Sequence, residues 1–171
     1  MEQNTNNIEL LNKITEFINS IGISCKPSSV KRDSFLPGVD IINGGIVYDA
    51  DQLLSPGDLL HEAGHIAVLK EQDRKDVTSP EVSGDLDPGG AELSAIAWSW
   101  AALKHLDIDP EVVFHDQGYK GDADNIIDNF RREHYFGVSM LQWFGMTNER
   151  QHDGTGGDIL YPAMQYWLRQ N

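Results

Sequence analysis

The segment from Leu59 to Val68 restricts the fold more than any other part of the sequence, because it is apolar and yet carries three ionisable side chains. These are His61, Glu62 and His65. The preceding Ser-Pro-Gly-Asp at residues 55 to 58 is typical of a helix start, so we expect a helix from about Pro56 to Lys70. A buried helix with such side chains needs a neighbouring element that supplies partners for them.

The two histidines and the glutamate form the pattern HExxH. Residues four apart lie on one face of a helix with roughly 5 to 6 Å between Cβ atoms, so His61 and His65 can reach one ion. Glu62 lies beside them, where its carboxylate can hold a zinc-bound water and take its proton. The sequence therefore predicts Zn²⁺ as cofactor, with His61 and His65 as ligands and Glu62 as catalytic base. The alternative is a helix with two ordinary histidines, whose imidazoles would then need other partners among apolar neighbours.

A third zinc ligand must come from elsewhere in the chain, because catalytic zinc usually keeps three protein ligands and one open position. The segment from Ala91 to Leu106 is apolar almost all round, as expected of a centrally buried helix, and Glu92 stands at its start. We expect Glu92 to be this ligand; the competitors are Asp85, Asp87 and His105. The other interpretation of Glu92 is an acid that complements the helix dipole in the first turn.

These features resemble the minimal gluzincin fold, and most closely the ImmA/IrrE-like metallopeptidases. In that family the third ligand stands in a Glu-x-Asn-x-aromatic-Ala pattern; residues 92 to 97 here read Glu-Leu-Ser-Ala-Ile-Ala, with Ser for Asn and Ile for the aromatic residue. The resemblance covers roughly residues 39 to 106. It implies a zincin-like domain in which the strand from Ile46 to Tyr48 is the sheet edge that receives an extended peptide.

The rest of the chain predicts an α+β, mostly α fold in a single zincin-like domain over residues 1–171, with a short antiparallel sheet or hairpin packed on the HExxH helix and further helices. We expect residues 23 to 38 to be irregular and residues 71 to 90 to form a long loop that borders the site. The remaining expected elements are a first helix over Ile8 to Ile21 ended by Gly22, a hairpin of Val39 to Ile42 and Ile46 to Tyr48 around Asn43-Gly44-Gly45, a helical turn from Pro110, and helices over Asp122 to Phe136 and Pro162 to Leu168.

A zinc hydrolase also needs a donor for the oxyanion of its tetrahedral intermediate. His115 and Tyr119, beside Gly118 and downstream of the two metal helices, are our candidates for this possible oxyanion stabiliser. The other downstream candidates are His134, Tyr135, His152 and Tyr161. Large aromatic residues at helical spacing are usually core, so we assign to packing Trp98, Trp100, Trp143, Phe144, Tyr166 and Trp167.

Charge and cysteine content limit the classes of partner. Thirteen basic and 27 acidic residues give a formal net charge of −14, which repels phosphate backbones and anionic lipid, so we expect neither nucleic acid nor a membrane as partner. Cys25 is the one cysteine, and neither a signal peptide nor a membrane span is apparent, so we expect a cytoplasmic protein.

The function expected from these residues is that of a zinc-dependent hydrolase, a metallopeptidase acting on a peptide or protein substrate through a Glu62-activated, zinc-bound water. One alternative is a non-catalytic zinc-binding regulatory or interaction protein on the same scaffold. A second alternative is a zinc-dependent amidase acting on a small substrate.

Overall fold

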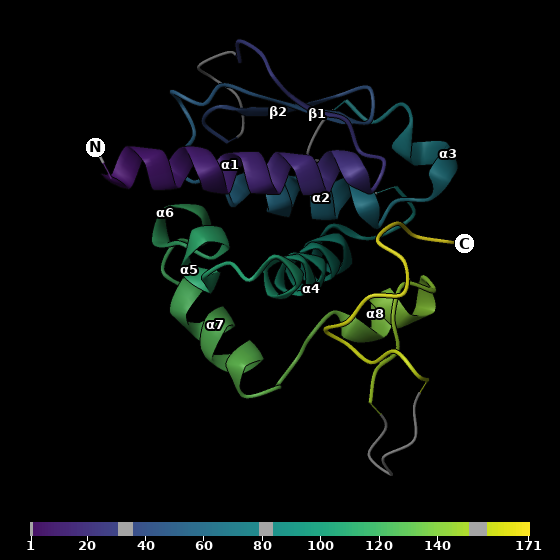
Figure 1. The fold of residues 1–171 in the computed structure, drawn as a ribbon. Helices are drawn as coiled ribbons and strands as arrows, with labels where there is room; N and C mark the ends of the chain where they lie inside the picture. Colours follow the sequence, from purple (N-terminus) through teal and green to yellow (C-terminus); the bar gives the residue numbers. More distant parts are fainter. Residues whose placement is uncertain (1, 31–35, 79–83, 151–156) are drawn as a thin grey trace.

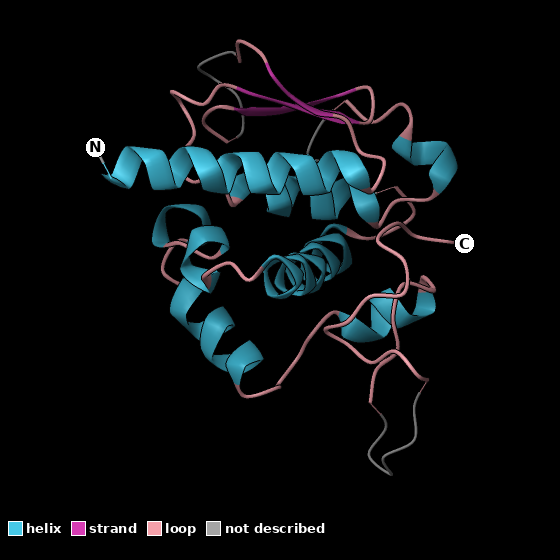
Figure 2. Ribbon diagram, viewed as in Figure 1, coloured by secondary structure: helices cyan, strands magenta, loops and turns pink. Residues whose placement is uncertain are grey.

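The fold is α+β and mostly α, as predicted (Figures 1 and 2). It is known from a computed structural model that describes residues 2–30, 36–78, 84–150 and 157–171. Within these ranges the elements are, in chain order, α1 (Glu2–Ser20), β1 (Cys25–Pro27), β2 (Val39–Ile42), β3 (Gly45–Tyr48), α2 (Asp58–Ala67), α3 (Glu71–Arg74), α4 (Pro88–Leu106), α5 (Pro110–Val113), α6 (Asp116–Tyr119), α7 (Ala123–Arg131) and α8 (Val138–Trp143).

The sheet has the strand order β1-β3-β2, so β3 is its central strand. Strands β2 and β3 form the predicted antiparallel hairpin, which turns at Asn43 and Gly44 with φ angles of 50° and 73°. Two positive φ angles are what a two-residue type I′ turn requires, and Asn-Gly is its preferred sequence. Strand β1 runs parallel to β3 and pairs Cys25 with Ile46, so the sheet is mixed and not purely antiparallel.

Two expectations about the sheet were wrong. Residues 23 to 38 were expected to be irregular, but the three residues of β1 lie within them. The strand from Ile46 to Tyr48 was expected to be an open edge, but β3 is hydrogen-bonded to a neighbour on each side. A peptide therefore cannot add to β3 by strand pairing, because its backbone donors and acceptors already have partners.

Helix α2 lies at the centre of the layered arrangement, with the sheet on one side of α1 and α2 and with α4 on the other (Figure 1). Helix α4 is buried along most of its length, which confirms the predicted central helix. Its two fully buried serines satisfy their hydroxyls locally, since Ser94 Oγ donates to the Gly90 carbonyl at 2.7 Å and Ser99 Oγ to the Ala95 carbonyl at 2.7 Å.

Gly64 allows α2 and α4 to approach closely. A Cβ atom at Gly64 would lie 3.0 Å from the Ala95 carbonyl oxygen and 3.2 Å from its Cα atom, closer than side chains normally pack. Helix α2 also begins at Asp58, two residues later than expected, and the Ser55 hydroxyl donates to the Val112 carbonyl at 2.5 Å. The start of α2 is therefore fixed by α5, and its middle by α4.

The end of α2 is held by Arg169. The Arg169 backbone N–H donates to the Ala67 carbonyl at 2.9 Å, and its guanidinium donates to the Val68 carbonyl at 3.3 Å. The same guanidinium binds both oxygens of Asp85 at 2.8 and 3.0 Å and lies 4.1 Å from the centre of the Phe144 ring. These hydrogen bonds lower the pKa of Asp85 to about 2. The Ala67 and Val68 carbonyls at the helix end thus both accept hydrogen bonds from Arg169, one from its backbone and one from its charged side chain.

Several expected boundaries differ from the structure. Residues 162 to 168 form turns and no helix, because the backbone N–H groups of Gln165 and Tyr166 donate to Met146. The loop expected over residues 71 to 90 contains α3 and the first turn of α4, and residues 79 to 83 lie outside the described ranges. Helix α7 ends at Arg131, before Phe136, and α6 and α8 were not expected. In the described part of the chain, no helix is long and apolar enough to cross a membrane.

The aromatic residues assigned to packing divide into two groups. Trp98, Trp100 and Phe144 are buried, and Trp167 packs against the core. Trp143 and Tyr166 keep 75% and 47% of their surface exposed, so for these two the assignment was wrong.

Replacing Gly64 by valine is expected to lower the free energy of unfolding by about 1 to 3 kcal/mol, because a branched side chain would be forced against the Ala95 backbone. Chemical denaturation measures this change. Asn12→Val, on the exposed side of α1, is the control and should change stability by less than about 0.5 kcal/mol. Equal stability of Gly64→Val and the wild type would contradict the close approach of α2 and α4.

Candidate metal site

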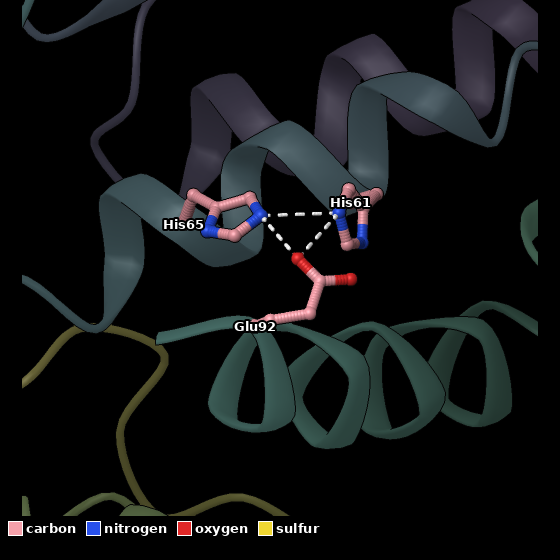
Figure 3. A group of neighbouring side chains, drawn as sticks. All are labelled: His61, His65 and Glu92. Atoms are coloured by element: carbon pink, nitrogen blue, oxygen red, sulfur yellow. Dashed lines mark hydrogen bonds and ion pairs between the residues drawn. The ribbon is translucent and has the colours of Figure 1, made fainter. Parts of the chain in front are cut away.

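Helix α2 presents His61 and His65 one turn apart on the side that faces α4 (Figure 3). Their Nε2 atoms lie 3.0 Å from each other, and the two rings are nearly perpendicular, at 89°. Both side chains are mostly buried, with 13% and 14% of their surface exposed. The helix therefore directs two imidazole nitrogens to a single point, as the spacing predicts.

Glu92 reaches the same point from α4 (Figure 3). Its Oε2 atom lies 3.1 Å from His65 Nε2 and 3.5 Å from His61 Nε2. Because α4 begins at Pro88 and is capped by Asp87, Glu92 belongs to the second turn, and the first turn of α4 contains no acid. The alternative of a dipole-complementing acid in the first turn is thereby removed, since the dipole effect falls off within that turn.

The two imidazoles favour the charged form of the Glu92 carboxyl group. Burial alone would raise the pKa of Glu92, but hydrogen bonds from His61 and His65, together with their charge, lower this pKa well below its ordinary range. The ligand atoms of the three residues all lie within 4.8 Å of one another, and among the described residues they form a group that could hold a metal ion. A cation between the three side chains would be held by the Glu92 carboxylate and by one nitrogen lone pair from each imidazole.

Glu62 follows His61 on α2 and is the third ionisable side chain of the motif. Its side chain is almost fully buried, and no hydrogen-bond partner for Oε2 occurs among the described residues. Burial is the main cause that raises the pKa of Glu62 to about 7; His65 opposes this change, and the carboxylates of Glu92, Asp58 and Asp40 add to it. A buried carboxylate oxygen without a partner is rare in folded proteins and marks a place where water, an ion or a substrate would bind.

Both ring nitrogens of His115 make hydrogen bonds away from His61, His65 and Glu92. Its Nδ1 atom accepts a hydrogen bond from the Gly118 backbone N–H at 3.3 Å, so the ring proton is on Nε2, which donates to Asp58 Oδ1 at 2.7 Å. Both ring nitrogens are thus in use. The contacts argue against His115 as the oxyanion stabiliser expected from the sequence.

Tyr119 contacts the metal helix from the opposite side of the His61 ring. Its hydroxyl lies 2.8 Å from His61 Nδ1, the ring nitrogen that does not face Glu92. An oxyanion stabiliser would have to face the substrate side of the metal. The observed contact argues against that role for Tyr119 as well.

The other candidates of the sequence analysis have partners elsewhere. Asp85 binds Arg169, Asp87 caps α4, and the His105 ring packs against Phe17 and Trp167 with centroid distances of 5.6 and 5.3 Å. Tyr161 donates its hydroxyl to the Ala97 carbonyl at 2.8 Å. His134 and Tyr135 line a separate cavity of about 680 Å³, and His152 lies outside the described residues.

Asp58 is a residue of this region that sequence reasoning interpreted too simply. Its place in the first turn suggested an acid that complements the helix dipole, yet its side chain is buried and bound to His115. Asp58 and His61 are three residues apart and share a helix face, and this spacing was the available signal. No local pattern could show that His115 and Tyr119 lie on that face.

Comparison of the chain with protein-family models, with curated proteins and with solved structures gives no significant match. The resemblance to ImmA/IrrE-like metallopeptidases therefore stays a prediction from the sequence motif. The site has to be interpreted from its own geometry.

Metal affinity of two variants tests the ligand set. Glu92→Gln should weaken metal binding by more than the roughly 10- to 100-fold typical of changes outside the first coordination shell, because it removes the charged donor. His105→Ala is the comparison, since His105 packs against α1 and should leave the affinity unchanged within a few-fold. Competition with a chromophoric chelator measures both. Loss of affinity in His105→Ala with retention in Glu92→Gln would reverse the assignment.

Proposed function

We propose that this chain is a zinc-dependent hydrolase, acting as a metallopeptidase, in which His61, His65 and Glu92 hold the zinc and Glu62 is the general base. The observation that carries this proposal is the meeting of the Glu92 carboxylate with both imidazole nitrogens beside a buried carboxylate that lacks a partner. Two histidines, one glutamate and an open position are a donor set of catalytic zinc.

The spacing of the three donor atoms supports an ion of this size. Tetrahedral zinc with bonds of about 2.0 to 2.1 Å separates its ligand atoms by about 3.3 to 3.4 Å. The corresponding separations here are 3.0, 3.1 and 3.5 Å. His61, His65 and Glu92 could therefore accept zinc with only small adjustments of their side chains.

Zinc in this position would act as a Lewis acid, polarising a substrate carbonyl and making water a better nucleophile near neutral pH. Glu62 would take the proton from the attacking water at Oε2, which is free of hydrogen bonds from the described residues. It would then deliver that proton to the leaving amine. Burial raises the pKa of Glu62, which makes its carboxylate a stronger base toward that proton.

The proposal includes a peptide or protein substrate and a cytoplasmic location, and it makes no use of nucleic acid or membrane. Cys25 is a buried free thiol, and burial raises its pKa to about 12, so it does not compete with the histidines as a thiolate ligand. A non-catalytic zinc-binding regulatory or interaction protein is the alternative. Such a protein would hold zinc with the same three ligands, but Glu62 would have no catalytic role in it.

Glu62→Gln separates these two functions. We expect this variant to bind zinc within a few-fold of the wild type and to lose about 10²- to 10⁴-fold in hydrolysis, because the amide cannot take the proton. Cleavage of a peptide library, followed by mass spectrometry, measures the loss. Glu16→Gln, on the exposed side of α1, is the matched control and should cleave normally.

Equal cleavage by Glu62→Gln and the wild type would contradict the role of Glu62. A wild-type protein that holds zinc and cleaves no peptide would instead favour the non-catalytic alternative.

A further inference from the structure

The short helix α6 is attached to the metal helix at both of its ends. His115 precedes α6 and binds Asp58, whereas Tyr119 closes α6 and contacts His61. Asp58 and His61 are three residues apart on α2, so the two contacts lie about one turn apart on the same face.

We propose that Tyr119 is a positioning residue for His61: its phenol oxygen accepts the Nδ1–H proton and so holds the imidazole in the tautomer and orientation that direct Nε2 to the metal. This inference rests on the proposed zinc site. It gives Tyr119 a task different from the oxyanion stabilisation considered at first.

The direction of the hydrogen bond follows from the count of protons. A neutral imidazole carries one N–H, and a nitrogen that binds a metal must offer a lone pair. Nε2 of His61 faces His65 Nε2 at 3.0 Å and Glu92 Oε2 at 3.5 Å, so Nε2 is the metal-binding atom. The proton is then on Nδ1, and the Tyr119 hydroxyl at 2.8 Å is the acceptor that it meets.

The phenol ring is held firmly in this position. It lies 5.6 Å from the His61 ring at an angle of 83°, and 5.4 Å from the buried ring of Phe114. At the other end of α6, Asp58 accepts from His115 Nε2 at 2.7 Å and from the Ser55 backbone N–H at 3.2 Å. The Asp58–His115 pair therefore fixes the turn that carries Tyr119.

The test compares Tyr119→Phe with the wild type in the zinc-loaded protein. Phenylalanine keeps the ring packing and removes the hydroxyl. We expect zinc to bind about 10- to 100-fold more weakly, as for other partners that orient a metal-binding histidine. Chelator competition measures this affinity. Tyr135→Phe is the control, because Tyr135 packs against Phe130 and Tyr161 away from α2, and its zinc affinity should equal that of the wild type.

Long-range ¹H–¹⁵N spectra provide a readout that a purely structural role would not change. In the zinc-loaded wild type, the Nδ1 proton of His61 should exchange slowly with water; in Tyr119→Phe it should exchange much faster. A wild-type spectrum without a protected Nδ1 proton would overturn the proposal, even if the variant failed to fold. Unchanged zinc affinity in a folded Tyr119→Phe protein would overturn it too.

These readouts do not use turnover, so they are independent of the test of hydrolysis. A wild type that binds zinc and cleaves nothing contradicts the proposed function alone. A Tyr119→Phe variant with normal zinc affinity and reduced cleavage contradicts the positioning role alone. That result would favour the role of oxyanion stabiliser for Tyr119. A wild type that binds no zinc overturns both.

Discussion

The close contact of α2 with α4 at Gly64 is the constraint on which the candidate metal site depends. Gly64 lies between the two histidines, and the absence of a side chain there lets the Ala95 backbone approach. Glu92 is one turn before Ala95 on α4, so this contact places its carboxylate opposite the imidazoles. A bulkier residue at Gly64 would push α4 away from α2. The Glu92 carboxylate would then lie farther from the two imidazoles, although the new side chain need not contact any of the three.

Charge around α2 is arranged so that one carboxylate is left without a partner. Glu92 lies against two imidazoles, which lower its pKa, and Asp58 lies against a third imidazole, that of His115. Glu62 has no such partner, and its pKa rises to about 7. The same helix thus carries at its start a carboxylate bound to an imidazole, and in its middle one whose pKa is raised by burial.

Sequence reasoning was accurate where local spacing determines the structure. The local sequence is enough to predict that the two histidines share a helix face and that the chain turns at Asn43-Gly44. It also predicts that the apolar segment after Glu92 is a buried helix. It failed where distant segments decide. Strand β1 forms by pairing with β3, which lies about twenty residues further along the chain. Residues 162 to 168 are not helical because the backbone N–H groups of Gln165 and Tyr166 donate to the Met146 carbonyl. The contact of Tyr119 with His61 likewise depends on tertiary packing.

Zinc K-edge X-ray absorption of the protein loaded with one equivalent of zinc tests the central claim most directly. We expect one tightly held ion with two imidazole ligands and oxygen donors at about 2.0 to 2.2 Å. The imidazole scattering should disappear when His61 and His65 are both replaced by alanine. Failure to retain zinc after reconstitution, or a spectrum that is unchanged in the double variant, would contradict the assignment of the site.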